Sequence, residues 1–256
     1  MLSAARRDKI LESLQQRRTV SVAELSVLCR VSEVTIRQDL KRLAQQGLLN
    51  RTRGGAVLST RANLELSFTA RQQLHADQKR RIGEVAAGLI RSGDSVILDA
   101  STTALHVLRA LKQRSGLRDI TVITNGIYTA LELLDRPDIT TILTGGMLRA
   151  TASSLTGLTG QQMLSQINGL KGFLGARGIT LENGLTDASI QEVQTKIAMV
   201  ERCQEVTAVL DASKFGVVSL ATFAPMESLR RIITDSDAPA ETVAAIRARG
   251  IEVLLA

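Results

Sequence analysis

Residues 21–43, SVAELSVLCRVSEVTIRQDLKRL, decide the fold of the first part of the chain. They hold two short amphipathic segments joined by a turn at residues 29–32. Ser21 and Glu24 have the capping-box spacing, in which each side chain accepts a hydrogen bond from the other residue's backbone N–H. Ser32 can cap the second segment, whose apolar residues recur every three or four positions. This pattern predicts a helix-turn-helix.

The residues on either side complete a small module. Ile10, Leu11 and Leu14 lie at helical spacing and predict a helix over residues 3 to about 17. Gly47 is expected to end the third helix, and residues 48–57 alternate well enough to predict a small hairpin wing. We therefore expect residues 1–57 to form a winged helix-turn-helix.

The charge is concentrated in this module. Residues 1–60 hold eleven basic and five acidic side chains, so they carry nearly all of the net charge of +7. A small polyanion-binding module joined to a neutral domain has this distribution. The alternative is a three-helix bundle with a solvated basic face, but the cap, the turn, the basic helix face and the basic wing together favour DNA binding.

The expected DNA interface is the outer face of the third helix and the wing. Thr35, Arg37 and Gln38 should reach base edges and phosphates in the major groove, and the remaining basic residues should mostly neutralise phosphates. Glu33 and Asp39 carry the same sign of charge as DNA, so we expect them to cap the helix or orient an arginine. The candidate DNA contacts are Ser32, Thr35, Arg37, Gln38, Lys41, Arg42, Arg51 and Arg53.

Residues 20–56 resemble the winged helix-turn-helix of the DeoR family of bacterial transcription regulators. The resemblance is strongest in residues 31–40, VSEVTIRQDL, and residues 53–56, RGGA. The family commonly has proline after the capping serine and a second arginine in the helix, where this sequence has Glu33 and Gln38. The resemblance implies that the partner is double-stranded operator DNA.

Beyond the wing, apolar runs of β type alternate with helical segments. Buried runs with helices between them predict a mainly parallel α/β sheet covered on both faces. The last run carries Glu252, so we expect it to be an edge strand. This larger domain should span residues 77–256, after a linker at residues 58–76. The runs are residues 95–98, 121–124, 140–143, 172–174, 206–210, 232–234 and 251–255.

In such a sheet the ligand crevice lies beyond the carboxyl ends of the strands. Thr102 and Thr103 follow the first run and open a helix, where free N–H groups favour an anion. Arg149 and Lys214 can add positive charge, and Asp99 can accept from sugar hydroxyls. These groups suit a phosphorylated polyol. The candidate effector contacts are Asp99, Ser101, Thr102, Thr103, Thr124, Asn125, Gly145, Gly146, Arg149, Glu192, Lys196 and Lys214.

Each of these signals also has a purely structural explanation. A Ser-Thr-Thr run before a helix is more often a cap than a phosphate site, and Gly145 with Gly146 alone is a turn. Glu192 and Lys196 can be a surface pair four residues apart. The core face of their helix would then be Ile190, Val193, Ile197 and Val200. Several loops converging on one rim favour a site.

Residues 78–235 resemble the sensor domain of the DeoR family, which is similar in fold to sugar-phosphate isomerases such as ribose-5-phosphate isomerase. The family usually has glycine where this sequence has Ser101. The resemblance implies a repressor of a carbohydrate operon that is released by a phosphorylated sugar. The matching segments are residues 93–103, 121–125, 145–149, 183–186, 192–196 and 211–216.

Composition and sequence pattern also lead to expectations about metals, cofactors, cellular location and oligomeric state. Cys29, Cys203, His75 and His106 are too few for a disulfide framework or a zinc cluster, so we expect no metal and no cofactor. The sequence shows no signal peptide and no long apolar segment, which predicts a cytoplasmic protein. One recognition helix reads few base pairs, so we expect a homo-oligomer, either a dimer or a tetramer.

Two other functions remain open from the sequence. A sugar-phosphate isomerase with a DNA-binding appendage would need a carboxylate base, for which Asp187 and Glu192 are candidates. An activator or architectural DNA binder would need no ligand. We expect a regulator that is not an enzyme.

Overall fold

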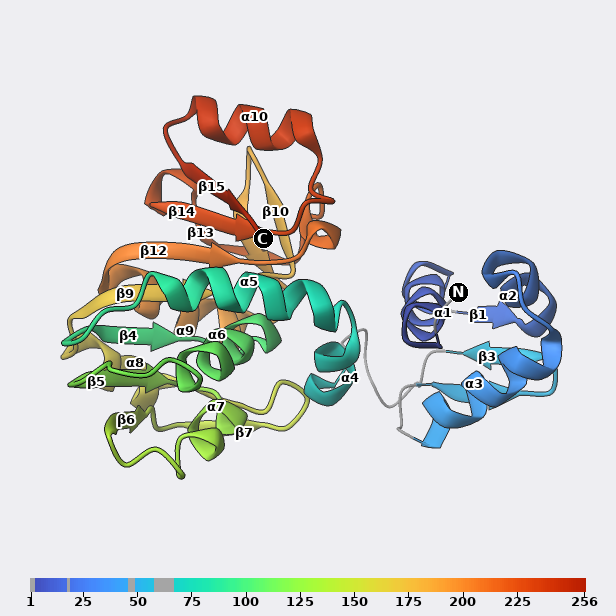
Figure 1. The fold of residues 1–256 in the computed structure, drawn as a ribbon, viewed down its shortest axis with the longest axis horizontal. Coiled ribbons are helices and arrows are strands. Elements are labelled where there is room, and N and C mark those ends of the chain that lie inside the picture. The colour runs from blue at the N-terminus through green and yellow to red at the C-terminus, as the bar shows by residue number, and fades with distance from the viewer. Residues whose placement is uncertain (1–2, 18, 46–48, 58–66) are drawn as a thin grey trace. The chain divides into compact units, whose positions relative to one another are not determined.

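The computed structural model describes residues 3–17, 19–45, 49–57 and 67–256 (Figure 1). The chain divides into two compact units, Met1–His75 and Ala76–Ala256. Each unit is a separate body with its own buried apolar residues.

The first unit is the expected winged helix-turn-helix. Its helices share one core, in which Ile10, Leu14, Leu25, Ile36 and Leu40 are buried. The three predicted helices and the wing are confirmed, while the expected helix end at Gly47 lies outside the described residues. The elements are α1 (Ser3–Arg17), β1 (Thr19–Ser21), α2 (Val22–Cys29), α3 (Glu33–Gln45), β2 (Asn50–Thr52), β3 (Gly55–Val57) and α4 (Phe68–Gln73).

Local hydrogen bonds explain the helix-turn-helix. Ser21 N donates to Glu24 Oε2 over 2.9 Å and Glu24 N donates to Ser21 Oγ over 3.1 Å, which is the predicted capping box. Helix α2 ends at Arg30, which adopts a left-handed conformation with φ of 54°. Thr35 N donates to Ser32 Oγ over 3.3 Å at the start of α3.

The wing belongs to a three-stranded sheet that the sequence did not indicate. Strand β1 pairs with β3 in the order β1-β3-β2. A Cβ at Gly55 would lie 2.0 Å from the Val20 carbonyl oxygen, so only glycine permits this approach. Strand β1 has only three residues, so its sequence shows no alternation of apolar and polar residues that would predict a strand.

The segment at residues 58–76 contains α4, and its residues 58–66 lie outside the described part of the chain. Ala70 and Leu74 belong to the buried cluster of the first unit. The division of the chain into residues 1–57, 58–76 and 77–256 stays a prediction.

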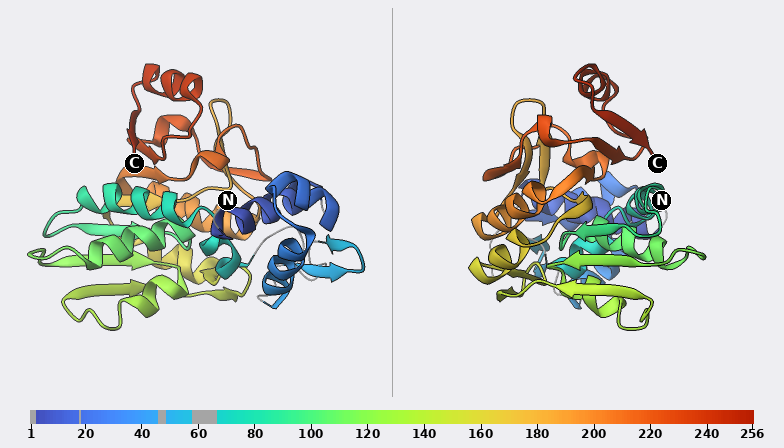
Figure 2. Two further views of the ribbon diagram at one scale, coloured as in Figure 1. Left: turned by 45° about the vertical axis from the view of Figure 1, so that its right-hand side comes forward. Right: turned by 90° about the vertical axis from the view of Figure 1, so that its left-hand side faces the viewer.

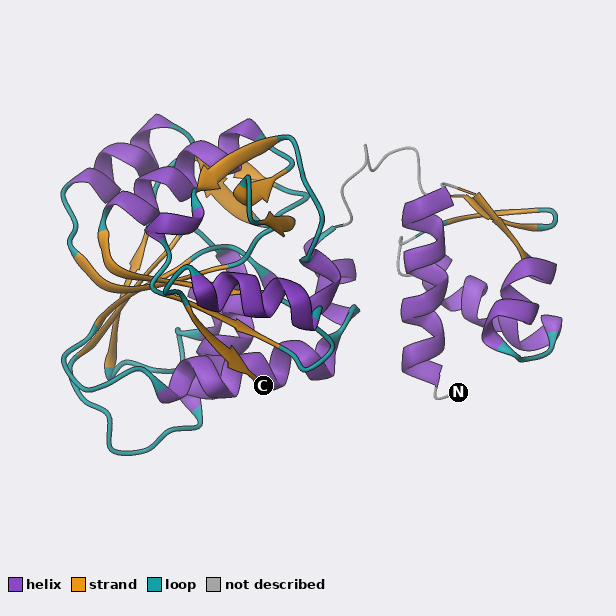
Figure 3. Cartoon of the chain, turned by 90° about the horizontal axis from the view of Figure 1, so that it is seen from above, coloured by secondary structure: helices purple, strands orange, loops and turns teal. Residues whose placement is uncertain are grey.

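The second unit is built on a seven-stranded sheet in the order β15-β14-β12-β9-β4-β5-β6, with every neighbouring pair parallel. Helices cover both faces of the sheet (Figure 3). Its strands are β4 (Ser95–Leu98), β5 (Ile120–Thr124), β6 (Ile139–Leu143), β9 (Gly169–Leu174), β12 (Cys203–Val209), β14 (Arg231–Thr234) and β15 (Glu252–Leu255). All seven predicted runs are strands, and β15 is at an edge as predicted.

The strand order reverses once. The chain adds β5 and β6 on one side of β4, and then β9, β12, β14 and β15 on the other. Figure 2 shows the result, with the β5–β6 region and the β14–β15 region at opposite ends of the unit. Ligand crevices of such sheets lie at the reversal, here beyond the carboxyl ends of β4 and β9.

The other elements surround this sheet. The helices are α5 (Ala76–Gly88), α6 (Thr102–Lys112), α7 (Ile127–Glu132), α8 (Leu158–Ser165), α9 (Ile190–Glu201) and α10 (Ala240–Ala248), with 3-10 turns η1 (Ala212–Lys214) and η2 (Met226–Ser228). Two smaller sheets are the hairpin β7 (Met147–Arg149) with β8 (Ser154–Thr156), and β10 (Gly178–Thr180) with β11 (Gly184–Asp187) and β13 (Ala221–Ala224). In the described residues, no helix has the length and apolarity to cross a membrane.

Candidate functional site

The outer face of α3 presents the predicted DNA contacts to solvent. Arg37, Gln38, Lys41 and Arg42 are exposed, as is Ser32, the residue just before the helix. Thr35, a further predicted contact, is half-buried and its hydroxyl lies 2.9 Å from that of Ser32. The helix therefore carries polar and basic groups on the side opposite its buried residues.

Both acidic residues of this region pair with arginines. Glu33 Oε2 accepts from Arg37 over 2.6 Å, four residues along α3. Asp39 Oδ2 accepts from Arg6 Nε of α1 over 2.5 Å. Glu33 thus orients Arg37, the arginine expected to contact bases. Asp39 connects α3 to α1 through its ion pair with Arg6.

The wing holds the other two candidates. Arg51 lies on β2 and Arg53 at the turn before β3, and both are exposed. Val22 N donates to the Gly54 carbonyl oxygen over 2.8 Å, which ties the wing turn to the start of α2. The contacts of all eight candidates with DNA stay a prediction.

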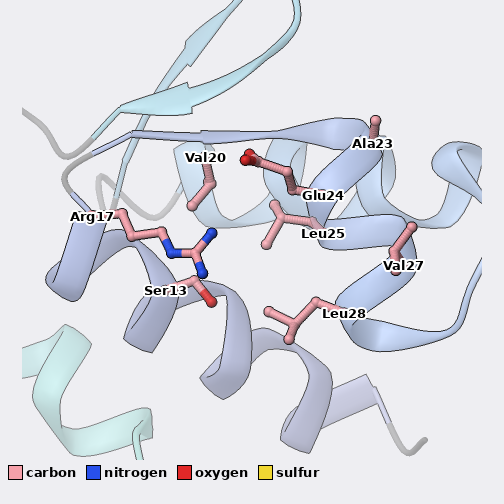
Figure 4. A pocket seen from close by; sticks show the side chains of 8 residues that line it. All are labelled: Ser13, Arg17, Val20, Ala23, Glu24, Leu25, Val27 and Leu28. Carbon is pink, nitrogen blue, oxygen red and sulfur yellow. The ribbon is translucent and has the colours of Figure 1, made fainter.

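An apolar groove of about 460 Å³ lies between α1 and α2 (Figure 4). Val27 and Leu28 are exposed at its edge. None of its lining residues belongs to α3 or the β2–β3 wing, so the groove is distinct from the predicted DNA interface. It is lined by Ser13, Arg17, Val20, Ala23, Glu24, Leu25, Val27 and Leu28.

In the second unit, Asp99 fastens together the loops at the strand reversal. It follows β4, is fully buried, and accepts from Ser101 N over 3.2 Å and from Gly175 N over 3.1 Å. Gly175 follows β9, so this one carboxylate joins the loops that follow β4 and β9, where the crevice is expected. Direct acceptance from a sugar hydroxyl stays a prediction, and the structure gives both Asp99 oxygens protein partners.

Lys196 of α9 lies in the same cluster. Its Nζ is 2.7 Å from Asp187 Oδ2 and 3.1 Å from Asp99 Oδ2, and it donates to the Gly175 carbonyl oxygen over 2.8 Å. Burial lowers the pKa of Lys196, but the two carboxylates outweigh burial and raise it above the ordinary value. For Asp187, burial raises the pKa, but Lys196 outweighs it and the net pKa is lowered.

Glu192 connects α9 with the β7–β8 hairpin. Its Oε1 accepts a short hydrogen bond from Ser154 Oγ and lies 3.6 Å from an Arg149 guanidinium nitrogen. Burial raises the pKa of Glu192, and the Ser154 hydrogen bond and Lys196 offset only part of this. The carboxyl is therefore easier to protonate than an exposed glutamate.

The interpretation of Glu192 and Lys196 as a surface ion pair is wrong. Both side chains are buried, at 5% and 6% exposure, and each has its own partners. The predicted core face of α9 is wrong in part, because Ile190 is exposed whereas Val193 and Met199 are buried. Distant carboxylates and a hydroxyl make it possible to bury the charged residues of this helix.

Ser101, Thr102 and Thr103 open α6 as predicted. Ser101 is its N-cap, and its hydroxyl accepts from Ala104 N over 3.1 Å. Thr102 and Thr103 are buried in the first turn. A Cβ at Gly175 would lie 2.5 Å from that of Ser101, so the β9 loop packs closely on this helix start.

Thr124 and Asn125 end the neighbouring strand β5. The Thr124 hydroxyl accepts from Gly126 N over 3.0 Å, and the Asn125 amide donates to the Leu155 carbonyl oxygen over 3.1 Å. The buried Asn125 Oδ1 has no hydrogen-bond partner among the described residues. Asn125 therefore joins the β7–β8 hairpin and keeps one acceptor available.

Gly145 and Gly146 form the connection from β6 to β7. Gly146 has φ of 130°, and a Cβ there would lie 2.3 Å from the Thr156 carbonyl oxygen of β8. The structural explanation of Gly146 as a turn residue is therefore sufficient. Glycine is needed there because β7 and β8 pack closely at this turn.

Lys214 ends the turn η1 after β12 and is half-buried. Its backbone N donates to the Asp211 carbonyl oxygen over 3.1 Å, whereas its side chain has no hydrogen-bond or ion-pair partner in the described part of the chain. The turn is held by Asp235 of the next strand end, whose Oδ2 accepts from Ala212 N over 2.8 Å. Asp187, Ser154 and Gly175 were absent from the predicted effector contacts. Asp187 was predicted only as a candidate carboxylate base, and Gly175 had a usable signal because it directly follows the predicted strand at residues 172–174.

A DNA-binding module followed by an α/β unit that gathers polar residues at the carboxyl ends of β4 and β9 defines a class of protein, the ligand-responsive transcription regulators. Comparison with known families agrees: residues 6–62 match the DeoR-like helix-turn-helix domain and residues 74–236 match the DeoR C terminal sensor domain. The chain belongs to the DeoR family and is a DNA-binding transcriptional regulator.

Curated relatives extend over nearly the whole chain. The HTH-type transcriptional regulator GolR of Listeria innocua is 37% identical over 92% of this chain and 92% of its own. The HTH-type transcriptional repressor GlcR of Bacillus subtilis is 36% identical over 88% and 86%. The glycerol-3-phosphate regulon repressor of Escherichia coli is 31% identical over 100% of both.

Among solved structures, ribose 5-phosphate isomerase A of Methanocaldococcus jannaschii aligns with 55% of this chain and 54% of its own. The identity is 17% and the TM-score 0.39. At that score the likeness adds nothing to the family assignment.

Proposed function

We propose that the protein is a cytoplasmic repressor of a carbohydrate operon and leaves its operator when a phosphorylated sugar binds the second unit. The observation that carries this proposal is the convergence of α6, the β9 loop, α9 and the β7–β8 hairpin on the carboxyl ends of β4 and β9. Relatives named as the glycerol-3-phosphate regulon repressor and as the HTH-type transcriptional repressor GlcR support it.

The crevice offers complementary groups for such an effector. The amino end of α6, at Thr102 and Thr103, favours the phosphate through backbone N–H groups and the helix dipole. Arg149 and Lys214 add positive charge, and the open acceptor of Asn125 suits a sugar hydroxyl. Asp99 and Lys196 act as positioning residues, because they hold the two bordering loops at fixed distances.

Release from DNA requires linkage between the two units. An effector shifts a conformational equilibrium only by its difference in affinity for the two states. In a homo-oligomer, the bound state would hold paired α3 helices at a spacing that no longer matches two half-sites. We therefore propose that the regulator works as a dimer or tetramer.

The proposal is tested by binding measurements with a panel of sugar phosphates. We expect one of them to raise the melting temperature and to release the operator, without turnover. Lys214→Ala should weaken its binding about tenfold to a hundredfold, as for the loss of a charge-assisted hydrogen bond. Thr102→Ala should weaken it less, because it removes a hydroxyl but keeps the backbone N–H groups at the start of α6.

Arg118→Ala is the matched control. Arg118 is exposed near the amino ends of the strands, away from the proposed site, and its loss should leave the affinity unchanged. Equal effector affinity in all three variants would show that the site lies elsewhere. No response to any sugar phosphate would favour a regulator without this ligand.

One observation favours a second candidate, an isomerase-like reaction. Burial raises the pKa of Glu192 beside the crevice, which is a property of carboxyl groups that move protons in catalysis. Turnover of a sugar phosphate that is lost in Glu192→Gln would support the enzyme. Binding without turnover would support the sensor.

A further inference from the structure

One apolar side chain lies on the exposed face of α3. Val34 is 61% exposed, whereas Ile36 and Leu43 on the same helix are at most 1% exposed. At about 100° per residue, Leu43 lies roughly 180° around the helix axis from Val34. Among the described side chains of α3, Val34 is the one large apolar group on the face directed away from the core. It therefore contributes little to the core of the first unit.

The residues beside Val34 are predicted base contacts. Arg37 and Gln38 are three and four residues further along α3, so their Cβ atoms are about 5–6 Å from that of Val34 on the helix surface. Both are exposed, and Arg37 is paired with Glu33. Glu33 is the first residue of the helix, which places Val34 in its first turn. The amino-terminal residues of a recognition helix are those that contact base edges.

A valine at this position has few groups to contact in DNA. A single exposed apolar residue is ordinary on a protein surface, and valine favours a helix less than most polar residues do. Phosphates are bound by basic and hydrogen-bonding groups, which a valine side chain lacks. In the major groove, however, thymine presents a methyl group, and apolar side chains contact it. The thymine methyl is therefore the group in DNA that suits Val34.

We propose that Val34 contacts the 5-methyl group of a thymine in the major groove and so determines one base pair of the operator. The proposal rests on the predicted DNA interface of α3 and does not depend on the effector. Base pairs are about 3.4 Å apart, so this thymine lies within about two base pairs of those that Arg37 and Gln38 contact. Cytosine there is disfavoured, because its amino group would face valine without a hydrogen-bond acceptor.

The test compares thymine with deoxyuridine, which lacks only this methyl group. A tightly bound duplex is first selected from a randomised library with the full-length protein, in the absence of sugar phosphates. Each thymine is then replaced singly by deoxyuridine, and binding is measured by fluorescence titration. Loss of one buried methyl group should weaken binding by the parent about fourfold at one thymine position of the site.

Variants assign this discrimination to one side chain. Val34→Ser should bind the thymine and deoxyuridine duplexes equally at that position, whereas Val34→Ile should keep the difference. Val27→Ser is the matched control, because Val27 is 79% exposed but lies on α2, where it lines the apolar groove (Figure 4). We expect Val27→Ser to discriminate as the parent does. Melting temperatures are measured for every variant, and Val34→Asn replaces Val34→Ser if the serine variant fails to fold.

The proposal is overturned by a parent that binds every deoxyuridine duplex as tightly as the thymine duplex. A Val34→Ser variant that still discriminates at the same position overturns it as well. Selection that enriches no duplex would overturn the predicted interface together with the proposal. Arg37→Ala on the same duplexes separates the two. If Arg37→Ala loses sequence preference while Val34→Ser keeps its discrimination, the interface stands and Val34 is not the residue that recognises thymine.

Discussion

Lys196 shows how a cation can be buried and remain charged. Its ammonium group has two carboxylates and one carbonyl oxygen as acceptors, supplied by Asp187, Asp99 and Gly175. It also lies 4.8 Å from the centre of the Phe223 ring. Because the two carboxylates exceed the effect of burial on its pKa, Lys196 is protonated at neutral pH. Three chain segments are thus joined at one atom.

Replacing Lys196 by methionine should lower the free energy of unfolding by about 3–5 kcal/mol, because Asp99 and Asp187 would be left buried without their cation. Lys112→Met is the control. Lys112 pairs with Asp135, whose side chain is 70% exposed, so solvent screening should leave this pair a much smaller contribution than that of Lys196. Urea unfolding measures both, and equal losses in the two variants would contradict the role given to Lys196.

His106 should make the protein less stable in mild acid. Burial, followed by the charges of Arg109 and Lys79, lowers its pKa to about 4, against the ordinary value of 6.5 for histidine. Between these values the unfolded chain binds a proton that the folded chain does not, so stability falls as the pH falls. The free energy of unfolding should change by at most about 1.4 kcal/mol per pH unit, and by roughly half of that after solvent screening of this partly exposed group.

The measurement is the free energy of unfolding from pH 7 to pH 4 in the parent and in His106→Gln. The raised pKa of Glu192 acts in the opposite direction, with stability lost as the pH rises, but it is common to both proteins. We expect a flatter profile in the variant. Parallel profiles would mean that His106 is not the group responsible.

At the scale of elements, helix α3 and the wing have separate tasks. Arg37 is held by Glu33 on the exposed face of α3, whereas Arg53 lies at the turn of the wing. Base contacts set sequence preference, and phosphate contacts set affinity and its salt dependence. Removing Arg37 and removing Arg53 should therefore have different effects on DNA binding.

Arg37→Ala is expected to abolish the preference for operator over random duplex, with a loss of about 1–3 kcal/mol on the operator alone. Arg53→Ala should weaken binding to every duplex and reduce the salt slope by roughly one unit. Fluorescence titrations at several salt concentrations separate the two effects. Unchanged operator affinity in both folded variants would disprove the assignment of the interface.

Helix α9 marks the limit of what the sequence predicts at this scale. The seven strands of the main sheet could be predicted because buried parallel strands are continuous apolar runs. The buried face of α9 could not, because Lys196 is buried against Asp187, Asp99 and the Gly175 carbonyl oxygen, and the last two lie far away in the sequence. The hairpin residue Ser154 gave no signal, since β7 and β8 have three residues each.

At the scale of the whole molecule, each unit has its own compact core, and the chemistry expected of each lies on a different surface. The first unit carries its basic groups on α3 and the wing, and the second gathers its buried ion pairs at the carboxyl ends of the strands. Most of the candidate crevice residues could be listed from the sequence because they follow predicted strands. Their partners could not, because the pairing depends on how the strands are ordered in space.

The order of the strands also governs how the protein is made. Strand β4 ends at Leu98 and its central partner β9 begins at Gly169, so ribosomes translating about 5–20 residues per second need roughly 4–14 s to supply the missing neighbour. During that interval one edge of β4 has no partner, which is a site for misassociation. We predict that nascent chains stalled after β8 has emerged are cut by protease within residues 95–143, and that chains stalled after β12 are protected. Equal resistance at both lengths would show that β4, β5 and β6 are stable before β9 arrives.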